Sequence, residues 1–201
     1  ILHINFFDSE GGAAIAVNRI HKYLVKEKID SYLLVCEKKT KDSRIFCSNS
    51  VFEKIVWECK KAISRNLGPF FQTKNKNTHS IGFFPSNILK KIKKINPDIV
   101  HLHWIGNEMI SIKQISKINK PIVWTLHDMW PYCGAEHYTQ DSRFKNGYQK
   151  KNRPDYEKGF DLNKWVWKRK KNIGILKLTS FVQVNGKKIW HPIAFYLKIK
   201  I

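Results

Sequence analysis

Two short segments carry residue types that could bind or orient a polar substrate. Gly11 and Gly12 stand directly before a helical pattern, where backbone N–H groups and the positive end of the helix dipole would attract an anion. A tight turn without a ligand explains these glycines equally well, and the full G-x-G-x-x-G pattern of dinucleotide-binding turns is missing. His127 ends an apolar run and is followed at once by an acid, Asp128, so it is the stronger candidate.

A second group of side chains has the chemistry of zinc or iron ligands. Two of its histidines lie two residues apart in an apolar run and therefore share one face of a strand. No pair in the group has the helical or close-loop spacing that metal sites favour. We therefore expect no metal site, and such histidines are more often core residues with satisfied hydrogen bonds. The residues of this group are His101, His103, His127, Cys133, Glu136 and His137.

The elements that must position these residues alternate between strand and helix, which predicts an α/β fold with a doubly wound parallel sheet. Ligands of such sheets bind beyond the carboxyl ends of the strands, where both candidate segments fall. The expected strands are 1–6, 31–36, 99–104 and 121–127; the expected helices are one opened by Gly11 and Gly12, 51–64, 88–95 with Ser86 as its cap, 108–118, and 161–171 with Asp161 as its cap.

The connections between these elements differ in length. Residues 73–78 are rich in lysine and asparagine and are expected to form a loop. Residues 129–159 are polar and aromatic without periodicity, and a connection of that length usually has a function.

Size and cysteine content indicate one α/β domain in a reducing cytoplasm. The chain has 201 residues, of which 42% are hydrophobic, enough to bury a core. The four cysteines are scattered without the close pairing of zinc sites or disulfide scaffolds. We expect neither a signal peptide nor a membrane span, because no apolar run approaches the roughly 20 residues of a spanning helix.

The formal net charge of +21 suggests attraction to anionic surfaces such as nucleic acid or the inner leaflet of a membrane. A lysine-rich proteome explains the charge about as well. No RNA- or DNA-binding motif accompanies the lysines, so we expect no nucleic-acid partner. The amphipathic segments Val51 to Arg65 and Ile88 to Lys94 combine cations with an apolar stripe and are expected to bind an anionic bilayer peripherally.

Several segments, taken in order, resemble a bacterial branch of glycosyltransferase family 4, and the resemblance covers residues 1 to 181. The closest match is the run from Pro121 to Trp130, Pro-Ile-Val-Trp-Thr-Leu-His-Asp-Met-Trp. Each piece is moderately specific and the ordered set is strong. The other matching segments are His3 to Asn5, Ser9 to Ala14, Arg19 to Leu24, Pro97 to Trp104, Cys133 to Tyr138, Asn152 to Pro154 and Asp161 to Trp165.

The resemblance implies one half of a GT-B fold, in which two Rossmann-like domains face a cleft. The N-terminal half would hold a saccharide or lipid-linked saccharide acceptor, and the absent half a nucleotide-sugar donor. It implies retaining transfer in surface polysaccharide biosynthesis with no cofactor or required metal. His127 would orient the reacting groups as the catalytic residue. Substrate contacts would come from Gly11, Gly12, His103, Trp104, Asp128, Glu136, His137 and Tyr138.

The sequence departs from the family pattern after Phe181. Read in a shifted frame, the codons permitted for Val182 onward allow the family's Pro-Ser-x-Trp and a following alanine, which Trp190 before His191 forces. We therefore expect residues 1–181 to form the acceptor-side domain and 182–201 to be an out-of-frame tail. With no donor domain, the chain is expected to transfer no sugar by itself, and an inactive remnant or binding module is the alternative.

Overall fold

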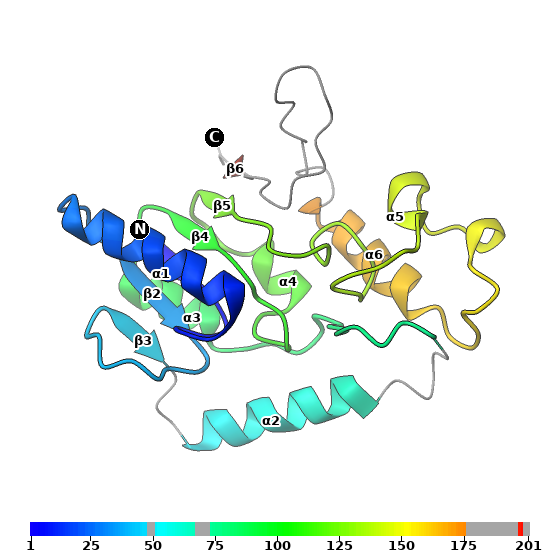
Figure 1. Cartoon of the computed structure of the whole chain (residues 1–201), viewed down its shortest axis with the longest axis horizontal. Helices are drawn as coiled ribbons and strands as arrows, with labels where there is room; N and C mark the ends of the chain where they lie inside the picture. The colour runs from blue at the N-terminus through cyan, green and yellow to red at the C-terminus, as the bar shows by residue number, and fades with distance from the viewer. Residues whose placement is uncertain (48–50, 67–72, 176–196, 199–201) are drawn as a thin grey trace.

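The structure is a computed structural model that describes residues 1–47, 51–66, 73–175 and 197–198, except for the side chains of Arg65, Leu197 and Lys198. Five parallel strands form a sheet in the order β3-β2-β1-β4-β5, and β6 pairs antiparallel with β5 at its edge (Figure 1). The predicted α/β doubly wound fold is confirmed. The elements are β1 Leu2–Ile4, α1 Gly11–Lys26, β2 Tyr32–Val35, β3 Ile45–Cys47, α2 Val51–Asn66, α3 Ile88–Ile95, β4 Val100–Leu102, α4 Ile112–Ile115, β5 Ile122–Trp124, α5 Arg143–Asn146, the 3-10 turn η2 Lys150–Asn152, α6 Leu162–Asn172 and β6 Leu197–Lys198.

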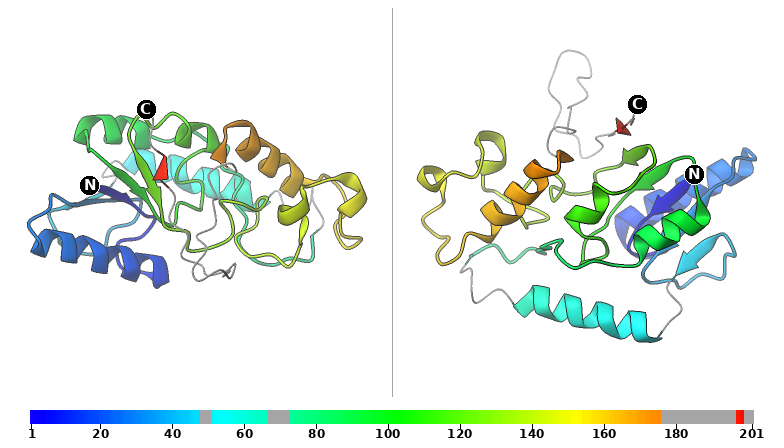
Figure 2. Two further views of the ribbon diagram at one scale, coloured as in Figure 1. Left: turned by 90° about the horizontal axis from the view of Figure 1, so that it is seen from above. Right: turned by 180° about the vertical axis from the view of Figure 1, so that it is seen from behind.

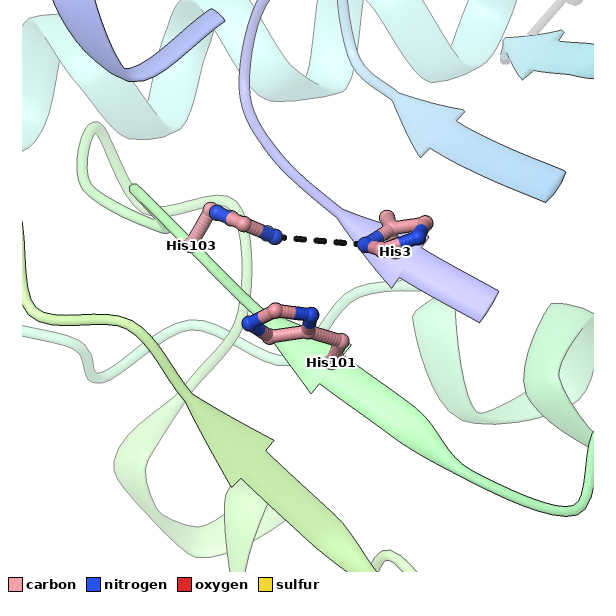
Figure 3. A group of neighbouring side chains, drawn as sticks. All are labelled: His3, His101 and His103. Carbon is pink, nitrogen blue, oxygen red and sulfur yellow. Dashed lines mark hydrogen bonds between the residues drawn. The ribbon is translucent and has the colours of Figure 1, made fainter. Parts of the chain in front are cut away.

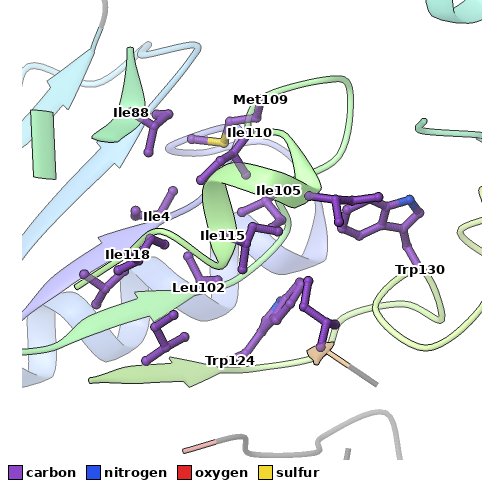
Figure 4. Close-up of a cluster of buried hydrophobic side chains, with 14 of the residues drawn as sticks. Ile4, Ile88, Leu102, Ile105, Met109, Ile110, Ile115, Ile118, Trp124 and Trp130 are labelled. Carbon is purple, nitrogen blue, oxygen red and sulfur yellow. The ribbon is translucent and has the colours of Figure 1, made fainter. Parts of the chain in front are cut away.

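Helices cover both faces of the sheet, with α1 on one side and α3 on the other (Figure 2). Successive strand residues point to opposite faces. Ile4 and Leu102 therefore face the larger core, which includes side chains of α3 and α4 (Figure 4). Leu33 and Val35 pack with Val17 of α1 in a smaller cluster. Burying each such side chain contributes about 1.5–3 kcal/mol, so both faces of the sheet hold helices in place.

Helix α3 keeps the predicted range, but its cap differs from the expectation. Two of its own side chains, Ile88 and Ile92, are buried against the sheet. The N-cap residue is Asn87 rather than Ser86, although the Ser86 hydroxyl accepts a hydrogen bond from the Ile88 N–H at 3.4 Å. Asn96 takes the left-handed conformation with φ 48° and ends the helix, as the Asn-Pro-Asp sequence predicts.

The helix predicted for residues 108–118 is wrong at its start. Asn107 and Glu108 have φ of 53° and 59°, in the left-handed region that interrupts a right-handed helix. The helix begins only after Ser111, whose hydroxyl accepts the N–H of Gln114 in a capping box. Only Ile112–Ile115 is helical.

The left-handed turn places a buried carboxylate where it organises three segments. Glu108 is 2% exposed, and its oxygens accept the backbone N–H groups of residues 81–83 at 2.8–3.1 Å. It also accepts the hydroxyl of Ser64 from α2 at 3.2 Å. Glu108 therefore holds the connection after residue 73 and the end of α2 against the sheet domain.

The long connection of residues 129–159 is ordered by buried charges rather than by regular structure. The Arg143 guanidinium is 1% exposed and donates to carboxylates of Asp141, Glu157 and Asp161. Asp161 also caps α6 by accepting the N–H of Lys164, as predicted. These pairs fix the connection to the start of α6.

Of the remaining predictions, one agrees with the structure, one strand was missed, and one is untested. Residues 73–78 contain no helix or strand, as expected for a loop. The pattern missed β3, a short strand. The predicted out-of-frame tail, 182–201, lies outside the described residues except for β6, so that prediction is untested.

Candidate functional site

The candidate residues follow the carboxyl ends of neighbouring strands. Strand β4 lies between β1 and β5, and all three run parallel. His103 follows β4 and His127 follows β5, and Nδ1 of His103 lies 3.1 Å from Nε2 of His127. The Trp104 N–H donates to Oδ1 of Asn5, which follows β1, at 2.9 Å. The three strand ends are therefore joined by side-chain hydrogen bonds at the edge where such sheets bind ligands.

His127 is half-buried, with one ring nitrogen occupied by His103. Burial lowers the pKa of His127, against the opposing charge of Asp128. The imidazole is therefore neutral at physiological pH and can donate at one nitrogen and accept at the other. The exposed hydroxyl of Tyr138 donates to the backbone oxygen of His127 at 3.2 Å, which holds the predicted acceptor loop next to this residue.

His103 and Trp104 lie below the surface at this edge of the sheet. His103 is 2% exposed, so it contacts His127 from behind rather than facing solvent. The half-buried Trp104 ring packs against Phe6 and Phe7 and lies 5.4 Å from the His137 ring. Both residues were predicted to line a cleft; in the structure His103 is buried and Trp104 is half-buried.

Asp128 and His137 are hydrogen-bonded to each other. Oδ2 of Asp128 lies 2.5 Å from Nδ1 of His137, and Nε2 of His137 lies 2.8 Å from the Ser80 hydroxyl. His137 is 2% exposed. The backbone N–H of Trp130 donates to Oδ1 of Asp128 at 3.0 Å. This network fixes the backbone just after His127.

Glu136 is also buried, at 1% exposed, and its Oε1 accepts from the Asn75 amide at 2.8 Å. Burial raises its pKa, while hydrogen bonds from Thr139 and Asn75 act in the opposite direction. Of the predicted acceptor-loop residues, only Tyr138 presents a largely exposed side chain, 55% of it accessible.

The predicted glycine pair follows the carboxyl end of β1 and is open to solvent. Gly11 has φ +80°, and both Gly11 and Gly12 are exposed. A Cβ added at either position would meet no atom within 4 Å. The N-cap residue, Glu10, makes no side-chain cap hydrogen bond. The first N–H groups of α1 are therefore not used by this cap, which suits a helix N-terminus that receives an anion.

Sequence reasoning missed His3 and Asn5. Nδ1 of His3 lies 3.3 Å from Nε2 of His103, and Asn5 holds Trp104. Both residues are buried polar groups in or just after β1. Their alternation within an otherwise apolar run was the available signal, because two residues spaced by two share one face of a strand.

A protein-family model also matches this chain. The family model described as Glycosyltransferase Family 4 matches residues 10–169. The matched range contains every predicted site residue from Gly11 to Tyr138. No curated protein and no solved structure gives a match.

Proposed function

Because this chain belongs to glycosyltransferase family 4, we propose that it is the acceptor-side domain of a retaining glycosyltransferase that uses a nucleotide-sugar donor. The parallel sheet with helices on both faces is the arrangement of one half of a GT-B fold. We further propose a role in surface polysaccharide biosynthesis, with a saccharide or lipid-linked saccharide as acceptor. No cofactor or metal is required for the transfer itself, and no nucleic acid takes part.

The observation that carries this proposal is the neutral imidazole of His127, held from behind at the ligand-binding edge of the sheet. His103 occupies Nε2 of His127 at 3.1 Å, which leaves Nδ1 of the half-buried ring for a substrate. A hydrogen bond from a fixed ring orients an acceptor hydroxyl or a donor sugar without an entropic cost at the moment of reaction. In this proposal His127 acts by positioning, and the glycine turn receives an acceptor phosphate.

Steady-state kinetics test the role of His127. The enzyme used joins this domain to a nucleotide-sugar-binding domain. We expect His127→Ala to lower kcat by about 100-fold, the typical loss when one preorganised hydrogen-bonding group is removed. His101→Ala is expected to cost less, because His101 lies within β4 and bonds to Thr125 at 2.8 Å. Equal losses in both variants, with folding unchanged, would contradict the assignment.

A binding experiment separates the acceptor-domain reading from a nucleic-acid binder. We expect the isolated chain to bind lipid-linked saccharides weakly, and the affinity to fall in His127→Ala. A nucleic-acid binder would instead bind oligonucleotides with an affinity that falls steeply as salt rises. Strong salt-dependent oligonucleotide binding with no saccharide binding would overturn the proposal.

We also propose peripheral association with the cytoplasmic face of an anionic membrane. Among the described residues, no helix is long and apolar enough to span a bilayer. Helix α2 presents Phe52 at 72% exposure and Ile55 at 56%. A lysine stripe that includes Lys90, Lys93 and Lys94 is exposed on α3. Exposed apolar side chains next to cations are the composition of an interfacial helix.

Vesicle sedimentation tests this association. Each cation near an anionic surface contributes on the order of 1 kcal/mol, so we expect the chain to sediment with anionic but not with neutral vesicles. Phe52→Ser with Ile55→Ser should weaken binding, and glutamine at Lys90, Lys93 and Lys94 should weaken it further. Equal binding to both vesicle types, or no change in these variants, would show that the charge reflects composition alone.

A further inference from the structure

Three buried imidazoles from two neighbouring strands converge on the α1 side of the sheet. His3 of β1 and His101 of β4 are register partners, and His103 comes two residues later on the same face (Figure 3). Each ring offers a nitrogen that lies within 4.8 Å of the corresponding nitrogens of the other two. Their exposed fractions are 0%, 9% and 2%. We propose that His3, His101 and His103 bind one divalent transition-metal ion of the zinc class.

The spacing suits a single small ion. Zinc binds histidine nitrogens at about 2.0–2.1 Å, so two nitrogens on a tetrahedral zinc are about 3.4 Å apart. Nδ1 of His3 and Nε2 of His103 are already 3.3 Å apart. The ring centroid of His101 lies 5.0 Å from that of His3 and 4.1 Å from that of His103. Small rotations of the rings would complete the site.

The outward-facing nitrogens fit the same interpretation. A metal-bound histidine usually engages its second ring nitrogen with a neighbouring acceptor, which fixes the ring. Nε2 of His101 lies 2.8 Å from the Thr125 hydroxyl, and this leaves Nδ1 for the ion. Nδ1 of His103 lies 3.1 Å from Nε2 of His127, and this leaves Nε2 for the ion. His101 and His103 therefore each have the outer hydrogen bond that orients a metal-binding histidine.

The third ligand, His3, would bind through Nδ1, which faces Nε2 of His103. Its other nitrogen, Nε2, then carries the proton; it is fully buried and makes no hydrogen bond within the described part of the chain, so His3 lacks the outer partner that the other two ligands have. Imidazole ligands without carboxylates favour zinc, copper or nickel over magnesium or calcium. Three histidines leave the fourth position of a tetrahedral ion for water or hydroxide.

An ion at this site would set the proton on His127. Metal bound to Nε2 of His103 makes its Nδ1 a hydrogen-bond donor, which directs an N–H toward Nε2 of His127. The neutral His127 ring then carries its own proton on Nδ1 and presents a donor to the substrate. This consequence rests on the proposed function, whereas the metal site itself does not.

Metal titration of the untagged chain, stripped with a chelator, tests the site. We expect one Co²⁺ per chain to give the visible absorption of a four-coordinate ion, and one Zn²⁺ to displace it and raise Tm. Removing one of three ligands is expected to weaken Co²⁺ affinity by more than about 100-fold, beyond the loss caused by outer-sphere changes. His3→Leu and His101→Gln are the two variants, so that one remains informative if the other fails to fold. His79→Gln, a histidine of the connection after residue 73, is the matched control.

The outcomes separate this site from adventitious binding. Loss of Co²⁺ binding in either folded variant, with binding kept in His79→Gln, supports the site. Absence of stoichiometric binding in the wild-type chain, or unchanged binding in both folded variants, overturns it. Because no sugar transfer is measured, the result is independent of the proposed function.

Discussion

At the level of single residues, His3, His101 and His103 show which part of the candidate site could be predicted from the sequence and which part could not. His127 followed by an acid, and two histidines spaced by two, predicted a site at the carboxyl edge of the sheet, where His103 and His127 do lie together. The third imidazole, His3, pairs with a residue 100 positions away. Spacing rules detect ligands that are close in sequence, whereas a parallel sheet joins strands that are distant in sequence. The prediction that the chain has no metal site was therefore made without His3, and it stays a prediction.

The buried histidines make the metal-free chain sensitive to acid. Burial, followed by the charge of His101, lowers the pKa of His3 to about 3; burial, followed by the charge of His127, lowers the pKa of His101 to about 4. The unfolded chain binds these protons near pH 6.5, so it holds more protons than the folded chain below that pH.

We therefore expect the free energy of unfolding, measured with a chelator present, to fall from about pH 6.5 downward. Each histidine contributes about 1.4 kcal/mol per pH unit until the folded-state pKa is reached. In His3→Leu the slope should decrease by about that amount. A slope that is the same in the variant and the wild-type chain would show that His3 titrates normally.

Lys170 is a buried cation whose role is to satisfy carbonyl groups. Its Nζ donates to the backbone oxygens of Trp130, Cys133 and Gly134 and lies 3.9 Å from the centre of the Trp130 ring. Burial lowers its pKa well below the usual range, and the charges of Cys133 and Asp128 oppose this shift.

We expect Lys170→Met to destabilise the fold by about 2–4 kcal/mol, because several buried carbonyls lose their donor. Lys168→Met is the matched control, since Lys168 is exposed on the same helix. Urea unfolding of the two variants makes the comparison. Similar midpoints for both would mean that water replaces the ammonium group without cost.

At the level of elements, the amphipathic helices were predicted well because their apolar spacing is local. The range of α3 and the aspartate cap of α6 match the prediction. The start of α4 was predicted wrongly because Glu108, a good helix former, bonds to the backbone of residues 81–83 in a left-handed turn. Strand β3 was missed because Phe46 at its centre is exposed and only Ile45 is buried, so no buried apolar run marks it.

The two glycines at the start of α1 are expected to differ in how much an alanine substitution changes stability. Gly11→Ala is expected to cost about 1–2 kcal/mol, because Gly11 has φ +80°. Gly12→Ala should be neutral or stabilise by up to about 1 kcal/mol, because an added Cβ meets nothing within 4 Å. Thermal unfolding of the pair measures this difference. A large destabilisation by Gly12→Ala would refute this account of the turn.

At the level of the whole molecule, α2 is attached differently from the helices that cover the sheet (Figure 1). Among its described side chains only Ser64, at 7% exposed, is buried. Its contacts include the Trp57 indole N–H to the Asn107 oxygen at 2.9 Å and the Glu53–Lys91 pair at 3.6 Å. A pocket of about 320 Å³ lies under it, lined by residues that include Val56, Ile88 and Met109.

From this mode of attachment we expect α2 to detach as a unit while the sheet stays folded. Segments with few buried apolar contacts open at lower free energy than the core, and their amides exchange sooner. We expect peptides from α2 to take up deuterium before peptides from α1, and Trp57→Ala to accelerate only the former. Lipid that enters the pocket should slow exchange in α2. Equal protection of the two helices would instead mean that the chain opens in a single cooperative step and the pocket stays closed.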